Sequence, residues 1–387
     1  MKPAPYKVAI AEPAVADLRR RLDATRYPPD LDNERGTYGV RRDWLEPLID
    51  YWRGDFDWRA QEAAINAYPQ FMVEIDGVPI HFVHVRGEGA ACKPLILSHG
   101  WPWTFWDYRG CIDRLTRPSA HGGRAEDAYD VVVPSLPGYG FSPLTRSGID
   151  VARIAELWVR LMRDVLGYPR FGAVGGDWGS FITGQLGHAH AEHMIGVYMT
   201  MVAVPGMDVV ESSRSSPFAP DEQWMPARVA ETQKTGLAHF IPQSYEPQTL
   251  AYMLTDSPAG MAAWIWGRRL KWSDCGGDIL SVYSADFLCT LASIYWFNCS
   301  MATSLRLYFE TFGGGWPPRA HDRTPVIEAP TGYGVFPKDL AFLPRKLVEE
   351  TTNLKRWSVM PRGGHFAPAE QPDLVVDEVR AFFADLD

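Results

Sequence analysis

The chain has 387 residues, of which 46% are hydrophobic and 22% charged, values ordinary for a globular protein with one large domain and an insertion or two modest domains. Its formal net charge of -9 and the lack of any block rich in lysine and arginine argue against a nucleic-acid partner. The chain contains no uninterrupted apolar run of roughly 18 residues, so we expect no membrane partner.

The cysteines and the N-terminal residues indicate the compartment. The five cysteines are odd in number and form no Cys-x-x-Cys pair, which favours a reduced protein without structural zinc. Residues 1–21 contain no apolar stretch of the kind that a signal peptide carries. We therefore expect a cytoplasmic protein, with a homodimer as a possible assembly.

The N-terminal region is predicted to form helices and loops, and a β-hairpin follows it. Apolar residues recur at the spacing of an amphipathic helix in 14–24 and in 42–53. The pattern changes at Phe71, where two apolar runs flank the turn residues Asp76–Gly77. The expected hairpin strands are 71–75 and 80–85.

Short strands alternate with helices beyond the hairpin. Brief apolar runs with few polar residues are typical of strands buried on both faces of a parallel sheet, and their alternation with helices predicts an α/β fold. The expected strands are 95–98, 129–134, 171–174, 196–201, 331–335 and 357–360, with helices at 149–166 and 374–383.

The alternation stops between residues 203 and 316. Helix-like segments at 247–254, 259–271 and 288–312 fill this stretch, and three glycines close it. We interpret it as a helical cap inserted into the sheet domain. The expected organisation is an N-terminal helical segment (1–70), a first part of the core (71–202), the cap (203–316) and a second part of the core (317–387).

The segment from Phe171 to Ser180 carries the strongest chemical signal. A short apolar run ends in Gly-x-Asp-x-Gly at Gly175–Gly179, the pattern of a nucleophile elbow, in which a tight strand-to-helix turn lifts one side chain into a cleft. The glycines are needed because a Cβ there would clash in the turn. Asp177 stands where Ser or Cys is usual. A carboxylate that attacks an alkyl carbon leaves an ester that water cleaves, whereas a serine alkoxide would leave a stable ether. The elbow therefore predicts substrates with an electrophilic sp³ carbon.

Two backbone N–H groups are candidates for an oxyanion hole. In α/β-hydrolases one comes from the loop after the third strand and the other from the residue after the nucleophile. These positions are Trp101, within His99–Pro102, and Trp178. A simple strand–turn at His99–Pro102 is the alternative.

The remaining catalytic candidates follow in chain order. His365 lies on a glycine-rich loop after the last expected strand, where a general base belongs, although a structural loop histidine is the alternative. Asp339 follows the preceding strand and is expected to orient His365 and stabilise its cation, unless it only caps a helix at Leu340. Tyr308 in the cap is expected to protonate an oxygen leaving group, unless it is an ordinary helix tyrosine.

The aromatic content is high, at 15 Trp, 16 Tyr and 18 Phe. Such side chains build either a bulky core or a wide aromatic pocket. Five of them crowd beside His99–Pro102, which favours the pocket, and we expect Trp103 and Trp106 to contact substrate.

Together these residues resemble the epoxide hydrolases of the α/β-hydrolase superfamily over nearly the whole chain. The likeness is to the microsomal and juvenile-hormone type, whose extra N-terminal segment wraps the core. It implies an α/β-hydrolase fold with a mostly parallel sheet, a helical cap insertion and a wrapping segment. The motifs that carry it are His99–Pro102, Pro134–Ser142, Gly175–Gly179, Thr255–Gly260, Phe336–Asp339 and Gly363–Phe366.

The resemblance implies a cofactor-independent mechanism through a covalent ester. Asp177 would be the nucleophile, His365 the base and Asp339 its partner, with Tyr308 as one of two ring-opening tyrosines. The substrates would be an epoxide and water, and the product a vicinal diol. No cofactor or metal is required.

The chain departs from the family at the second ring-opening tyrosine. That tyrosine usually lies in a Tyr-x-x-Ile-Gln segment, but here counting back four from Gln243 lands on His239. Either His239 replaces it, since an imidazole also donates a hydrogen bond, or Tyr245 supplies the hydroxyl from a shifted loop. Trp103 stands where the family usually has a small residue, which should reshape the pocket mouth.

Two other functions compete with epoxide hydrolysis. A haloalkane dehalogenase shares the Asp nucleophile and the cap, and the Trp178 indole could hold halide. A binding module on this fold would have lost part of the triad, whereas Asp177, Asp339 and His365 are all present. We expect a bulky or aromatic epoxide, with a role in natural-product biosynthesis such as the tailoring of enediyne antibiotics.

Overall fold

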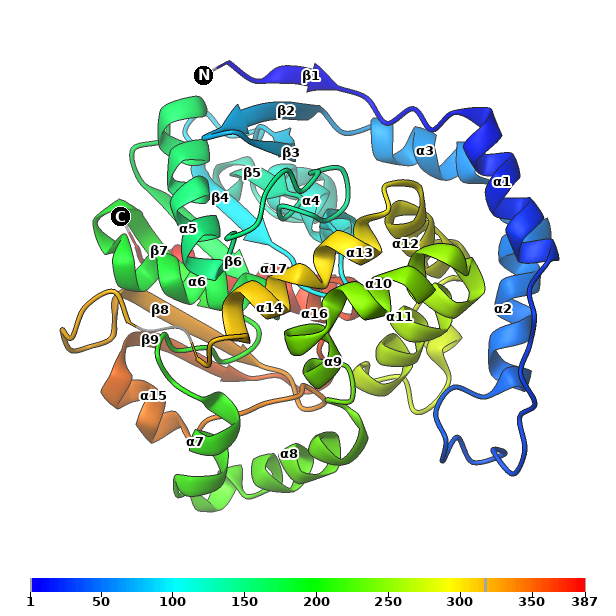
Figure 1. Cartoon of the computed structure of the whole chain (residues 1–387). Helices are drawn as coiled ribbons and strands as arrows, with labels where there is room; N and C mark the ends of the chain where they lie inside the picture. The colour runs from blue at the N-terminus through cyan, green and yellow to red at the C-terminus, as the bar shows by residue number, and fades with distance from the viewer. Residues whose placement is uncertain (1, 317–318, 387) are drawn as a thin grey trace.

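The computed structural model describes residues 2–316 and 319–386 and is built around one sheet (Figure 1). Its strands lie in the order β1-β2-β3-β5-β4-β6-β7-β8-β9. The pairs from β1 to β5 are antiparallel, and the pairs from β5 through β4 to β9 are parallel. The strands are β1 (Ala4–Tyr6), β2 (Gln70–Ile75), β3 (Val78–Val85), β4 (Lys93–Ser98), β5 (Tyr129–Pro134), β6 (Phe171–Gly175), β7 (Met194–Met199), β8 (Ile327–Val335) and β9 (Thr352–Val359).

Helices cover both faces of the parallel part of the sheet, which explains why β5, β6 and β7 are buried along their whole length. Neighbouring residues of β7 show the two faces. A Cβ on Gly196 would meet Phe382 of α17 (Pro372–Phe383), whereas Val197 meets α6 (Trp178–Ala189) at Gly187. Helix α5 (Val151–Arg160) packs beside α6, and α4 (Arg109–Thr116) beside α17. The predicted hairpin, strands and final helix are confirmed.

The N-terminal segment runs from the edge of the sheet along the inserted helices (Figure 1). Strand β1 adds to the sheet edge beside β2. Helices α1 (Glu12–Asp23), α2 (Arg42–Gly54) and α3 (Trp58–Asn66) then contact the helices inserted after β7. The Trp52 indole of α2 donates a 3.0 Å hydrogen bond to Ser293 Oγ there. Both predicted helices form, while β1 and α3 were not expected from the sequence.

Eight α-helices lie in the described chain between β7 and β8. The expected helix-like segment 288–312 is divided, because Cys299 adopts a left-handed φ of 49° and an α-helix cannot continue through that conformation. No helix in the described part of the chain combines the length and the apolar character needed to cross a membrane. The helices are α7 (Val209–Ser215), α8 (Trp224–Thr235), α9 (Phe240–Tyr245), α10 (Pro247–Asp256), α11 (Pro258–Trp272), α12 (Ala285–Phe297), α13 (Ser300–Ser304) and α14 (Arg306–Phe312).

Candidate active site

Asp177 lies on a strained turn between β6 and α6. Its backbone has φ 54° and ψ -123°, a conformation that a non-glycine residue adopts only where the surroundings enforce it. A Cβ on Gly179 would overlap the Ser98 carbonyl, and one on Gly175 would overlap the backbone of Gly179. The turn therefore requires glycine on both sides of Asp177, as the Gly-x-Asp-x-Gly pattern predicts.

Asp177, Asp339 and His365 come together at the ends of β6, β8 and β9. His365 Nδ1 lies 2.7 Å from Asp339 Oδ1, and Nε2 lies 3.2 Å from Asp177 Oδ2. The His365 side chain is fully buried, and that of Asp177 is 14% exposed. Asp339 does not cap a helix at Leu340, because the next helix is α15 (Arg345–Thr351).

The two carboxylates set the charge of the histidine. Burial alone would lower the pKa of His365, but the charge of Asp339, the hydrogen bonds to both carboxylates and the charge of Asp177 raise this pKa to about 9. At neutral pH His365 is therefore an imidazolium between two carboxylates. Its Nδ1–H donates to Asp339 and its Nε2–H donates to Asp177.

One backbone N–H group binds the Asp177 side chain, and a second follows Asp177 directly in the chain. The Trp101 N–H donates a 2.7 Å hydrogen bond to Asp177 Oδ1. Trp178 is the first residue of α6, where the N–H has no acceptor within the helix. A Cβ on Gly100 would overlap the Asp177 side chain, so this close approach requires glycine. His99 fixes the loop, because its Nε2 accepts a 3.1 Å hydrogen bond from the Leu136 N–H.

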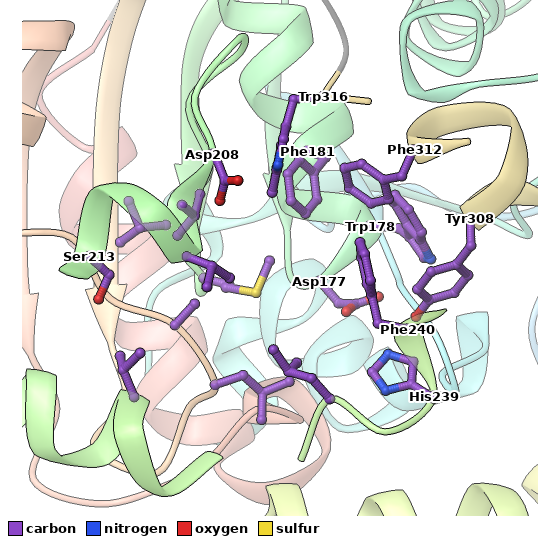
Figure 2. Close-up of a pocket in the computed structure, with 18 residues that line it drawn as sticks. Asp177, Trp178, Phe181, Asp208, Ser213, His239, Phe240, Tyr308, Phe312 and Trp316 are labelled. Atoms are coloured by element: carbon purple, nitrogen blue, oxygen red, sulfur yellow. The ribbon is translucent and has the colours of Figure 1, made fainter. Parts of the chain in front are cut away.

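A cavity of about 320 Å³ opens beside Asp177 (Figure 2). Aromatic side chains from α6 and α14 form one wall, where Trp178 and Phe312 stack with ring centroids 5.3 Å apart. Polar groups are few, which suits a largely apolar ligand with a reactive group at Asp177. The aromatic lining residues are Trp178, Phe181, Phe240, Tyr308, Phe312 and Trp316. The remaining lining residues with polar side chains are Asp177, His239, Asp208 and Ser213.

Tyr308 and His239 lie on the same side of Asp177 (Figure 2). Tyr308 projects from α14 and is 3% exposed. Burial and then the charge of Asp177 raise the pKa of its hydroxyl well above the usual value, so it stays protonated. The Trp178 indole and the Gln243 amide adjoin this hydroxyl.

His239, the residue just before α9, lines the cavity. Its ring stacks on Trp101 with centroids 5.1 Å apart and stands 5.5 Å from the ring of Tyr308. Burial and then the charge of Arg268 hold the pKa of His239 well below its usual value. The imidazole is therefore neutral and can donate one hydrogen bond.

Three residues expected to bind substrate lie elsewhere. Tyr245 is 60% exposed at the end of α9 and does not line the cavity, because α9 turns it toward solvent. Trp103 is buried behind the base, with its ring 5.6 Å from that of His365, because its N–H turns back to the Gly100 carbonyl. Trp106 packs against Tyr68, since it belongs to a short 3-10 helix capped by Thr104.

Most of the cavity wall was not expected from the sequence. Helical spacing could have found part of it, because residues three or four apart share a face. Phe181 follows Trp178 by three positions on α6, and Phe312 follows Tyr308 by four on α14. Phe240 and Trp316 carry no such signal, because their place depends on how α9 and the chain after α14 fold back.

Comparison with known proteins agrees with this geometry. The chain matches the family model of the epoxide hydrolase N terminus over residues 3–108 and that of the alpha/beta hydrolase fold over residues 93–235. A relative from Stigmatella aurantiaca is 38% identical over 384 residues, which cover 99% of this chain and 85% of the relative. Epoxide hydrolase 1 of Oryctolagus cuniculus is 32% identical over 408 residues, covering 98% and 88% of the two chains.

A solved structure extends the comparison to the whole fold. The juvenile hormone epoxide hydrolase of Bombyx mori aligns with a TM-score of 0.88 at 26% identity, covering 99% of this chain and 94% of that one. These matches favour epoxide hydrolysis over haloalkane dehalogenation. The chain has the α/β-hydrolase fold and belongs to the epoxide hydrolase family.

Proposed function

We propose that this epoxide hydrolase converts bulky, aromatic epoxides into vicinal diols through a covalent ester on Asp177. The observation that carries the proposal is the carboxylate on the elbow, with its Oδ1 bound by the Trp101 N–H and its Oδ2 3.2 Å from His365 Nε2. A hydrogen-bonded Oδ1 becomes the carbonyl oxygen of the ester, and Oδ2 is the attacking atom. The aromatic cavity wall supports the choice of substrate class.

In the first step the Asp177 carboxylate attacks one oxirane carbon. A carbon–oxygen bond to Asp177 forms, the ring carbon–oxygen bond breaks, and its electron pair stays on the ring oxygen. Tyr308 gives this oxygen a proton, and neutral His239, in the tautomer whose N–H faces the cavity instead of the Gly236 carbonyl, donates a hydrogen bond to it. Acid assistance of this kind contributes roughly 10²- to 10⁴-fold in rate.

In the second step His365 acts as the base. Esterification removes the Asp177 charge that helps hold the proton on His365. The imidazolium therefore releases that proton, which returns to the Tyr308 oxygen that lost its own proton in the first step. Neutral His365 then takes a proton from water, and the hydroxide attacks the Asp177 carbonyl carbon. The Trp101 and Trp178 N–H groups bind the oxyanion, each worth about 3 kcal/mol in comparable enzymes. Collapse then breaks the acyl carbon–oxygen bond, and the leaving alkoxide takes the proton of the added hydroxyl. The diol leaves, and the carboxylate–imidazolium pair is restored.

The His365→Gln variant tests this assignment, because it should form the ester but not hydrolyse it. The variant is mixed separately with styrene oxide and with 1-chlorohexane, and the intact protein mass is read. We expect a gain equal to the whole epoxide, located on Asp177, and none after Asp177→Asn is added. A gain from the chloroalkane with chloride release would instead identify a dehalogenase.

The substrate class has its own test. Aryl epoxides should exceed propylene oxide in kcat/KM by about tenfold or more, because burying a ring against the aromatic wall contributes a few kcal/mol that a methyl group cannot match. Equal kcat/KM values for styrene oxide and propylene oxide would contradict the aromatic preference.

A further inference from the structure

The loop that carries His365 is held through four consecutive backbone N–H groups. The Gly363 N–H donates to Asp274 Oδ2 at 2.9 Å, and the Gly364 N–H to Glu370 Oε2 at 3.0 Å. The next two, of His365 and Phe366, donate at 2.9 Å to the Trp272 carbonyl and to Glu370 Oε1. None of these acceptors belongs to the triad. The backbone on both sides of the base is therefore tied to groups outside the chemistry.

Glu370 joins the loop to the inserted helices. It ends α16 (Ala367–Glu370), directly after the loop, and its Oε2 also accepts a 2.8 Å hydrogen bond from the Asp274 N–H. Trp272 is the last residue of α11, and Asp274 lies just beyond it. Gly364 permits this close approach, because a Cβ there would meet the Trp272 carbonyl at 2.5 Å. One carboxylate thus spans the base loop and the end of α11.

The surroundings of Glu370 make this an unusual carboxylate. It is 8% exposed, and burial raises its pKa to about 7 against the opposing effect of three backbone N–H donors and of Arg269. The guanidinium of Arg269 is itself buried, ion-paired with Asp107, and lies 3.9 Å from the centre of the Phe366 ring. A buried carboxylate persists only where hydrogen bonds offset its desolvation, and here the base loop supplies two of the three.

We propose that Glu370, with Asp274, is a positioning residue for the base, which fixes the base loop to the end of α11 so that His365 faces the ester formed on Asp177. The inference rests on the proposed function. It predicts an unequal effect on the two steps. Ester formation depends on Asp177, which the elbow and the Trp101 N–H hold independently of this loop. Ester hydrolysis depends on where His365 directs water.

Glu370→Gln tests the role while keeping the size of the side chain. The amide replaces one acceptor oxygen with a donor, so at least one of the three N–H groups loses its partner. In single-turnover reactions with styrene oxide, we expect ester hydrolysis to slow roughly 10- to 100-fold while ester formation stays within about threefold of wild type. The ester should then accumulate in intact-protein mass spectra.

Two further variants sharpen the experiment. Asp274→Ala removes a single acceptor, that of the Gly363 N–H, and should slow hydrolysis about severalfold with the same preference for the second step; it also replaces Glu370→Gln should that variant fail to fold. Glu378→Gln is the matched control, because this half-buried carboxylate of α17 binds Arg356 rather than the loop. It should leave both rates unchanged.

Each outcome decides the matter. Hydrolysis at the wild-type rate in Glu370→Gln, or an equal loss in both steps together with a lowered Tm, would overturn the positioning role. Failure of the wild-type enzyme and of His365→Gln to form any ester would instead overturn the proposed function, and the inference with it. Selective slowing of hydrolysis supports both.

Discussion

The proposed mechanism requires His365 to change its proton affinity when Asp177 becomes an ester, and Asp177→Asn isolates that change. The amide keeps the shape of the carboxylate 3.2 Å from His365 Nε2 but removes its charge, as esterification does. Two unit charges about 4 Å apart attract by about 4 kcal/mol at an effective dielectric constant near 20, and about 1.4 kcal/mol corresponds to one pKa unit. Removing the Asp177 charge alone would therefore lower the pKa of His365 by about three units or slightly more.

The residual contacts reduce this loss. Asp339 keeps its charge 2.7 Å from Nδ1, and the amide oxygen still accepts a hydrogen bond. We expect the pKa of His365 to fall by at least about one unit from its wild-type value of about 9. The sign follows from the charge, since removing an anion disfavours the imidazolium. The neutral base then exists near physiological pH.

Nuclear magnetic resonance of the ring protons gives the measurement. The chain has ten histidines, and the spectrum of His365→Gln identifies the resonance that belongs to this one. Asp208→Asn is the control, because Asp208 lines the same cavity but its carboxylate accepts a hydrogen bond from the Glu211 N–H. A pKa that remains near 9 in Asp177→Asn would refute the reasoning, since Asp339 alone would then hold the proton.

Three further predictions concern ring opening and stability. Tyr308→Phe should slow ester formation about 100-fold, and His239→Gln by less, in rapid-quench mass measurements, because one removes the acid and the other a supporting donor. Gly179→Ala should lower the free energy of unfolding by about 3 kcal/mol or prevent folding, because the added Cβ overlaps the carbonyl at the end of β4. Arg269→Met should lower the free energy of unfolding, measured with urea, by about 3–5 kcal/mol, because it leaves Asp107 buried and unpaired.

The parts of the fold that the sequence predicts well are those whose signal is local. Short apolar runs predict the buried strands, and two glycines around Asp177 predict the elbow. Both patterns report contacts made within a few residues, such as the overlap of Gly175 with Gly179. The placement of Asp339 and His365 was predictable for a related reason, because parallel strands bring the loops after their ends to one edge of the sheet.

The parts that failed depend on the direction in which a turn or helix points a side chain, or on contacts distant in sequence. Trp103 and Trp106 adjoin the oxyanion loop in sequence, yet a turn and a capped 3-10 helix bury them away from the cavity. Tyr245 and His239 are six positions apart, and only the direction of α9 decides which one faces Asp177. Glu370 meets Asp274 across 96 residues of chain. No periodicity in the sequence encodes that meeting.

Because the base loop is fixed, the change in the pKa of His365 has to come from a change of charge beside the ring. In the proposed mechanism His365 must be an imidazolium before ring opening and a neutral base after it, within one turnover. A mobile loop could achieve this by moving the ring, but four backbone hydrogen bonds hold the segment from Gly363 to Phe366 in place. The change must then come from the partner rather than from the base. Asp177 provides it, since its charge beside Nε2 disappears when the ester forms and returns when water cleaves it.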